Sequence, residues 1–172
     1  MNRISVSWNL IASLFSLSGI LLAQNNTSFE SAKPGEFNEL KTSLGTWLPE
    51  VGRTIVDDAH AKTGEQCLQL TGGEKTSAIL RLADDADTSG VLSFWAERWT
   101  SRAPFSFRIE KRTGDEWAEI FNGDDSVKVG RAFLNHVKIP LGDDSIRELR
   151  FTFTSPPGTG VLLDDFRPAP AT

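Results

Sequence analysis

The stretch Phe105-Ser106-Phe107-Arg108-Ile109-Glu110-Lys111 decides the fold class. Apolar side chains alternate in it with polar ones, a period of two that is typical of a β-strand with one face in a core and one in water. Residues 149–154 repeat this alternation with Leu, Phe and Phe against Arg, Thr and Thr. By the same criteria we predict further strands at residues 67–70, 78–82, 90–98, 117–121 and 133–139.

Turn-forming residues divide the rest of the chain at regular intervals. Glycines recur from Gly45 to Gly160, with spacings of about 8 to 12 residues that are typical of an all-β sandwich. The segment Arg112-Thr113-Gly114-Asp115 predicts a tight turn in which Gly114 takes a positive φ. We therefore predict an all-β fold, a two-sheet antiparallel jelly-roll β-sandwich of about nine to eleven strands.

The N-terminal residues have the pattern of an export signal. Arg3 precedes an apolar run at residues 11–22, and Ala23 offers a small residue for cleavage. The run is too short to cross a membrane as a helix; a retained membrane anchor is the alternative. The predicted organisation is a signal peptide at 1–23, a flexible N-terminus at 24–28, the jelly-roll β-sandwich at 29–168 and a linker-like tail at 169–172. We accordingly expect a secreted, periplasmic or cell-surface protein, with no membrane span after signal cleavage.

Charge and residue usage exclude several classes of function. The net charge of −5 disfavours a broad basic surface, so nucleic acid is not an expected partner. Cys67 is the single cysteine, which excludes an internal disulfide, and we expect it to be a small buried apolar side chain. No serine lies in a G-x-S-x-G motif. A chain without tyrosine cannot be a sialidase of the usual tyrosine-nucleophile type.

The segment with the most side chains suited to binding a ligand is residues 95–107, W-A-E-R-W-T-S-R-A-P-F-S-F. We interpret this segment as the middle of a β-hairpin. Trp95, Glu97 and Trp99 share one strand face by period two. Sugars stack their C–H faces on indole rings, and their hydroxyls or carboxylates accept hydrogen bonds from guanidinium groups. The alternative is that the indoles are buried and the charged groups form surface pairs. The predicted ligand-binding residues are Trp95, Glu97, Trp99, Arg102 in the following turn, and Arg108, which we expect across from them on the next strand.

Three segments together resemble the galactose-binding-like jelly roll of carbohydrate-binding modules. Phe29-Glu30-Ser31 resembles its opening strand, and Ala59-His60-Ala61-Lys62-Thr63-Gly64 with Cys67-Leu68-Gln69-Leu70 is similar to its histidine-to-glycine turn and the next strand. Val161-Leu162-Leu163-Asp164-Asp165-Phe166 resembles its closing strand with an acidic pair. Residues 92–98 are also similar to a segment in the accessory β-sandwich domains of secreted sialidase-like proteins.

The resemblance implies a secreted, non-catalytic carbohydrate-binding module, an accessory domain of a sialidase-like glycan-degrading system, with a glycan or polysaccharide as partner. The absence of tyrosine departs from the aromatic platforms of such modules, so the binding face would rest on Trp95 and Trp99 with Trp47 or Trp117. Two alternatives remain open. One is a structural or protein-interaction β-sandwich with a protein partner, and the other is a glycoside-active enzyme with two carboxylates facing each other across a cleft.

Asp164 is a candidate metal ligand because it shares its strand face with Leu162 and Phe166. The free-energy cost of burying a carboxylate on an apolar face must be offset by hydrogen bonds or by a positive charge. A structural Ca²⁺ held by Glu30, Asp164 and backbone carbonyls would supply it, and the resemblance implies such an ion between the first and last strands. The alternative is that Asp164 accepts hydrogen bonds from backbone amides or pairs with an arginine.

Overall fold

The computed structural model describes residues 29–73, 75–142 and 146–169. The predicted signal peptide, the N-terminus at 24–28 and residues 170–172 lie outside this part. No helix in the described ranges is long and apolar enough to cross a membrane. These ranges hold twelve strands: β1 (Gly35–Glu36), β2 (Leu40–Thr42), β3 (Gly45–Val51), β4 (Thr54–Asp57), β5 (Cys67–Thr71), β6 (Thr76–Leu82), β7 (Val91–Arg98), β8 (Ser106–Thr113), β9 (Glu116–Asn122), β10 (Asn135–Pro140), β11 (Glu148–Thr154) and β12 (Gly160–Ala169).

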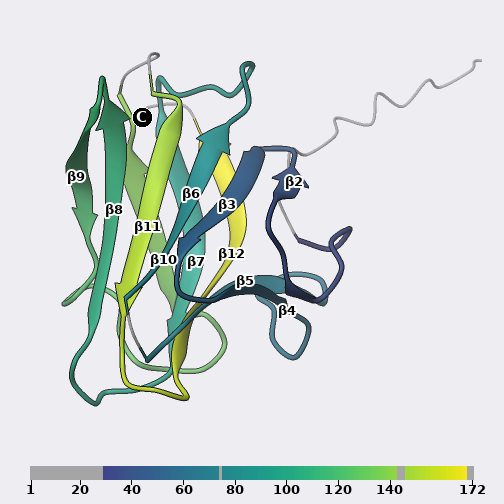
Figure 1. The fold of residues 1–172 in the computed structure, drawn as a ribbon, viewed down its shortest axis with the longest axis vertical. Helices are drawn as coiled ribbons and strands as arrows, with labels where there is room; N and C mark the ends of the chain where they lie inside the picture. The colour runs from purple at the N-terminus through teal and green to yellow at the C-terminus, as the bar shows by residue number, and fades with distance from the viewer. Residues whose placement is uncertain (1–28, 74, 143–145, 170–172) are drawn as a thin grey trace, which may run out of the picture.

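The strands form two stacked sheets of six strands (Figure 1). The first sheet has the order β1-β4-β5-β12-β7-β10, and the second has the order β2-β3-β6-β11-β8-β9. Every ladder within the sheets is antiparallel. The predicted two-sheet antiparallel jelly-roll β-sandwich is confirmed. β12 includes Ala169, one residue past the predicted domain end.

The main core lies between the sheets and follows the alternation seen in the sequence. Phe107, Ile109, Phe151 and Phe153 are fully buried between the layers, whereas the polar residues between them face outward. The predicted turn at Gly114 joins β8 to β9 with φ of 62°. Phe29 is also buried in this core, but residues 29–31 form a turn and not the expected opening strand.

The stretch from Trp95 to Phe107 is not a hairpin. β7 belongs to the first sheet and β8 to the second, so the segment between them crosses from one layer to the other. Consecutive antiparallel strands can be joined within one sheet or across a sandwich, and both arrangements need the same alternation. The prediction of a hairpin was therefore wrong, because the local pattern does not show which sheet the next strand joins.

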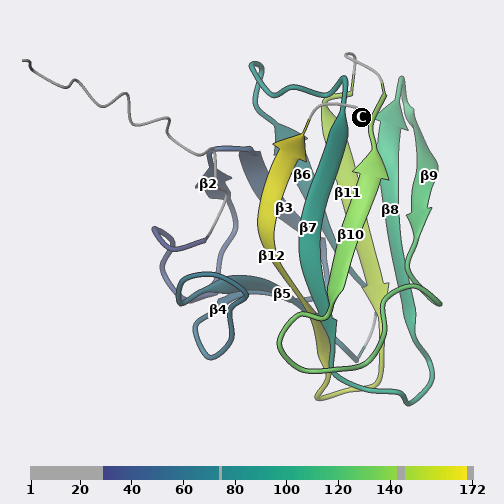
Figure 2. The ribbon, with the colours of Figure 1, turned by 180° about the vertical axis from the view of Figure 1, so that it is seen from behind.

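The outer face of the first sheet carries a second, smaller apolar cluster. Cys67, Leu162 and Phe133 are buried there, and the rings of Trp95 and Trp99 pack against them. Cys67 is therefore the buried apolar side chain that we expected. Two loops flank this face, the β4–β5 loop (residues 58–66) and the β9–β10 loop (residues 123–134), as Figure 2 shows on either side of β12 and β7.

Candidate ligand-binding site

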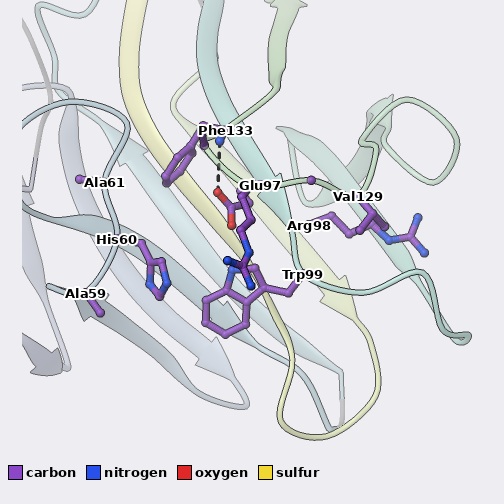
Figure 3. Close-up of a pocket in the computed structure, with 11 residues that line it drawn as sticks. Ala59, His60, Ala61, Glu97, Arg98, Trp99, Val129 and Phe133 are labelled. Atoms are coloured by element: carbon purple, nitrogen blue, oxygen red, sulfur yellow. Dashed lines mark hydrogen bonds between the residues drawn. The ribbon is translucent and has the colours of Figure 1, made fainter.

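A pocket of 810 Å³ opens on the outer face of the first sheet (Figure 3). Three segments line it: residues 59–61 of the β4–β5 loop, residues 97–99 at the end of β7, and residues 129–133 of the β9–β10 loop. The segments are far apart in the sequence. They meet because the β4–β5 loop is hydrogen-bonded to Asp164 of β12, one neighbour of β7, and the β9–β10 loop leads into β10, the other neighbour of β7. Pockets of this size can hold a small organic ligand or part of a polymer.

Glu97 gives the pocket a buried carboxylate. Glu97 is only 4% exposed, and the backbone N–H of Phe133 donates a hydrogen bond to Glu97 Oε2 at 3.1 Å (Figure 3). Ala132 and Phe133 both have left-handed backbone conformations, with φ of 66° and 51°. Such conformations are costly for residues other than glycine and persist where their surroundings hold them. Glu97 therefore both lines the pocket and fixes the loop that forms one of its walls.

Trp99 and His60 form the aromatic part of the lining. Trp99 is half-buried, and its ring centroid lies 5.4 Å from that of His60, with the planes tilted by 57°. His60 Nδ1 lies 2.9 Å from Asp57 Oδ2 at the end of β4. The prediction that Trp95, Glu97 and Trp99 share a face is confirmed, and the structure brings Glu97 and Trp99 together in one pocket.

Trp95 lies on the same face but outside the lining of the pocket. Its ring stacks on His136 with a centroid distance of 4.6 Å and an interplanar angle of 12°. The ammonium of Lys62 lies 3.8 Å from the same ring. Both contacts occupy the Trp95 indole, so of the two predicted indoles Trp99 is the one that the pocket presents.

The structure does not bring the two predicted arginines to the pocket. Arg102 is exposed in the connection after β7 and bonds to Thr100 Oγ1 through its backbone N–H and its side chain. The expectation that Arg108 lies across from Trp95 and Trp99 is wrong, because β8 is in the second sheet. There Arg108 pairs with Asp124, and its Nε lies 3.1 Å from Glu119 Oε2.

The Arg108–Asp124 pair makes stability depend on pH. The hydrogen bond from Arg108 holds the pKa of Asp124 below its usual 3.8. A carboxyl whose pKa is lower in the folded state stabilises the fold above its usual pKa, and the contribution is lost as pH falls through the folded pKa. We expect Asp124→Asn to lower Tm at neutral pH, and the difference from wild type to shrink as pH falls below 3.8. Thermal unfolding over a pH series measures this, and a difference that does not change with pH would contradict it.

The two predicted metal ligands both bind the β4–β5 loop through hydrogen bonds. Asp164 Oδ2 accepts from the backbone N–H groups of Lys62 and Thr63 at 2.7 and 3.0 Å, and its Oδ1 accepts from Asp165 N–H. Burial raises the pKa of Asp164 even so. Glu30 accepts from the N–H groups of residues 65 and 66.

Carboxylates that face N–H donors do not match the all-oxygen donor set of Ca²⁺. No group of three or more His, Cys, Asp or Glu residues suited to a metal is found in residues 29–73, 75–142 and 146–169. Asp164 accepts hydrogen bonds from backbone amides, which is the alternative that we gave to metal binding. The structural Ca²⁺ at Glu30 and Asp164 stays a prediction. The expected shared face of Asp164 and Phe166 is wrong, because a bulge between Asp164 and Arg167 turns Phe166 into the main core.

Neither of the two further candidate tryptophans lies on the outer face of the first sheet. Trp47 is fully buried in the main core, and Trp117 lies on β9 in the second sheet, so neither contributes to this face. Sequence reasoning missed Phe133 and His60 as lining residues. The resemblance placed His60 in a turn, but no local pattern shows that this turn folds over β7.

Comparison with known proteins supports the fold. No family model and no curated protein matches the sequence. The CBM22-1 xylan-binding domain from Paenibacillus barcinonensis Xyn10C is 23% identical, with a TM-score of 0.50 over 84% of this chain and 94% of that one. SGBP-B from a complex xyloglucan utilization locus in Bacteroides uniformis is 15% identical, with a TM-score of 0.47 over 84% of this chain and 49% of that one. CBM28, a carbohydrate-binding module specific for non-crystalline cellulose, is 17% identical, with a TM-score of 0.46 over 82% and 90%. By its likeness to the first of these structures, the chain shares the β-sandwich fold of a carbohydrate-binding module.

Proposed function

We propose that the protein is a non-catalytic carbohydrate-binding module that holds a glycan or polysaccharide in the pocket on the outer face of its first sheet. The observation that carries this proposal is the half-buried indole of Trp99 beside the buried carboxylate of Glu97 in one pocket. An indole stacks against the C–H face of a sugar ring, and a carboxylate accepts strong hydrogen bonds from sugar hydroxyls.

The composition of the lining supports binding without catalysis. Most glycoside hydrolases use two carboxyl groups that flank the scissile bond. Glu97 is the one acidic side chain among the described residues that line the pocket. The xylan-binding domain has the same fold, and by analogy this supports a polysaccharide as the class of ligand.

We propose that the module acts outside the cell, as an accessory to a sialidase-like glycan-degrading enzyme. Residues 92–98, which resemble a segment of such accessory domains, support this association, and the apolar run at residues 11–22 supports export.

A glycan array probed with the purified chain tests the proposed function. We expect retention on at least one class of glycan, and we expect that glycan to protect tryptophan fluorescence from iodide quenching, because a bound sugar covers Trp99. The protection should disappear in Trp99→Phe, because this variant lacks the indole that the sugar covers. Trp47, fully buried, should contribute a constant unquenched signal in both proteins. Absence of retention on every neutral and acidic glycan would refute the proposed function.

A further inference from the structure

His60, one of the lining residues of the pocket, is hydrogen-bonded to Asp57, and sequence reasoning did not assign this pair to any role. Asp57 ends β4, and His60 follows three residues later in the β4–β5 loop. The Asp57 side chain is 13% exposed and that of His60 is 46% exposed, so the carboxylate lies below the imidazole. His60 Nδ1 lies 2.9 Å from Asp57 Oδ2.

This contact determines which nitrogen of His60 carries the hydrogen. A carboxylate only accepts hydrogen bonds, so the Nδ1 that faces Asp57 must be the donor. In the neutral imidazole the other nitrogen, Nε2, then has a free lone pair and acts as an acceptor. His60 lines the pocket, so Nε2 is the ring nitrogen that remains for a ligand.

The pocket therefore offers two acceptors near one indole. The His60 ring is 5.4 Å from that of Trp99, and the Glu97 carboxylate lines the same pocket. Sugar hydroxyls can donate to both acceptors. The carboxylate of an acidic sugar has no hydrogen to donate and would be repelled by the negative charge of Glu97.

The two arginines of the lining do not reverse this preference. The Arg98 guanidinium lies 3.5 Å from the centre of the Phe105 ring, and its Nε donates to Thr100 O at 2.7 Å. These contacts hold it at the end of the sandwich. Arg131 is exposed, where solvent screens its charge.

We infer that Asp57 is a positioning residue that fixes His60 with Nε2 as a hydrogen-bond acceptor, and that the pocket consequently selects neutral sugars over uronic and sialic acids. The choice of sugar rests on the proposed function, whereas the state of the imidazole does not. A role of Asp57 as a mere brace for the loop would leave the ligand preference unchanged.

The state of the imidazole can be measured without any glycan. Long-range proton–nitrogen correlation spectra report which ring nitrogen is protonated, and the chain has only two histidines. His136→Gln identifies the His60 signals by elimination. In the spectra of the neutral imidazole we expect the His60 hydrogen on Nδ1, and we expect Asp57→Ala to shift it toward Nε2. A wild-type His60 protonated at Nε2, or no change in Asp57→Ala, would overturn the inference.

Calorimetric titration with soluble xylan as the neutral probe and polygalacturonate as the acidic probe tests the selectivity. We expect xylan to bind more tightly, and Asp57→Ala to weaken its binding about tenfold. Asp58→Ala is the matched control, because Asp58 is the next residue in the chain and is exposed, whereas the carboxylate that meets His60 Nδ1 is that of Asp57. The control should bind as wild type.

His60→Gln separates positioning from bracing. A glutamine amide offers an acceptor oxygen without needing Asp57 to set its state. In the His60→Gln background, Asp57→Ala should therefore leave the affinity unchanged, as a double-mutant cycle would show. An equal loss in both backgrounds would overturn the positioning role, and tighter binding of polygalacturonate would overturn the selectivity. If the protein bound neither probe and no glycan on the array, the proposed function would be refuted. The spectra would still show whether Asp57 sets the protonated nitrogen of His60.

Discussion

Trp99→Ala is expected to weaken glycan binding by roughly 30-fold, or about 2 kcal/mol, the worth of one sugar ring stacked on an indole together with its buried area. Trp99 is the indole that lines the pocket, whereas the Trp95 ring is occupied by His136 and Lys62. Affinity electrophoresis or calorimetry with a glycan that the array retains would measure the change. Trp95→Ala should have a smaller effect on affinity, because its ring lies outside the pocket.

Trp117→Ala is the matched control for this experiment. Trp117 is half-buried like Trp99, but it lies on β9 of the second sheet, with the Arg150 guanidinium 4.5 Å from its ring. Its removal should leave glycan affinity unchanged, even if it lowers Tm slightly. Equal affinity losses in Trp99→Ala and Trp117→Ala, or no loss in Trp99→Ala, would contradict the assignment of the site to the first sheet.

The fold could be predicted because its signal is local. The alternation in β8 and β11 and the turn at Gly114 are properties of short segments, and they are the same in any sandwich that buries one face. Which strands become neighbours is not local. Arg108 was misplaced because the polar face of β8 is equally consistent with either sheet, and its partner Asp124 follows 16 residues later in a loop.

The site could be predicted only in part for the same reason. Period two placed Glu97 and Trp99 on one face correctly. The lining also depends on His60 and Phe133, which reach β7 from two loops whose paths are set by contacts elsewhere. The β4–β5 loop is held by Asp164 and Glu30, about 100 and 35 residues away in the chain.

Asp164 and Glu30, which the resemblance suggested as ligands of an ion, have a structural role that needs no ion. Each accepts hydrogen bonds from backbone N–H groups of the β4–β5 loop and so holds the path of that loop. The loop carries His60 over the pocket. Asp164 and Glu30 therefore link the closing strand and the N-terminal turn to the geometry of the pocket.

Phe166→Ala is expected to destabilise the fold by about 3–5 kcal/mol, the usual cost of removing a buried phenylalanine from a packed core. The bulge in β12 turns this ring inward, where it is fully buried. It stacks on Phe94 at a centroid distance of 4.9 Å and meets Trp47 and Phe151 edge-on at 5.2 and 5.9 Å. The ring thus joins side chains from both sheets, and its loss leaves a cavity that neither sheet can close alone.

Denaturant unfolding at constant slope measures this cost, since a shift in midpoint without a change in slope reports stability. Phe121→Ala is the control, because Phe121 is only half-buried at the edge strand β9, and we expect it to cost less than half as much. Phe166→Leu, which keeps most of the volume, should cost about 1–1.5 kcal/mol and remains measurable if the alanine variant does not fold. If Phe166→Ala cost no more than Phe121→Ala, the ring would not be the centre of the core, and the bulge would not serve to place it there.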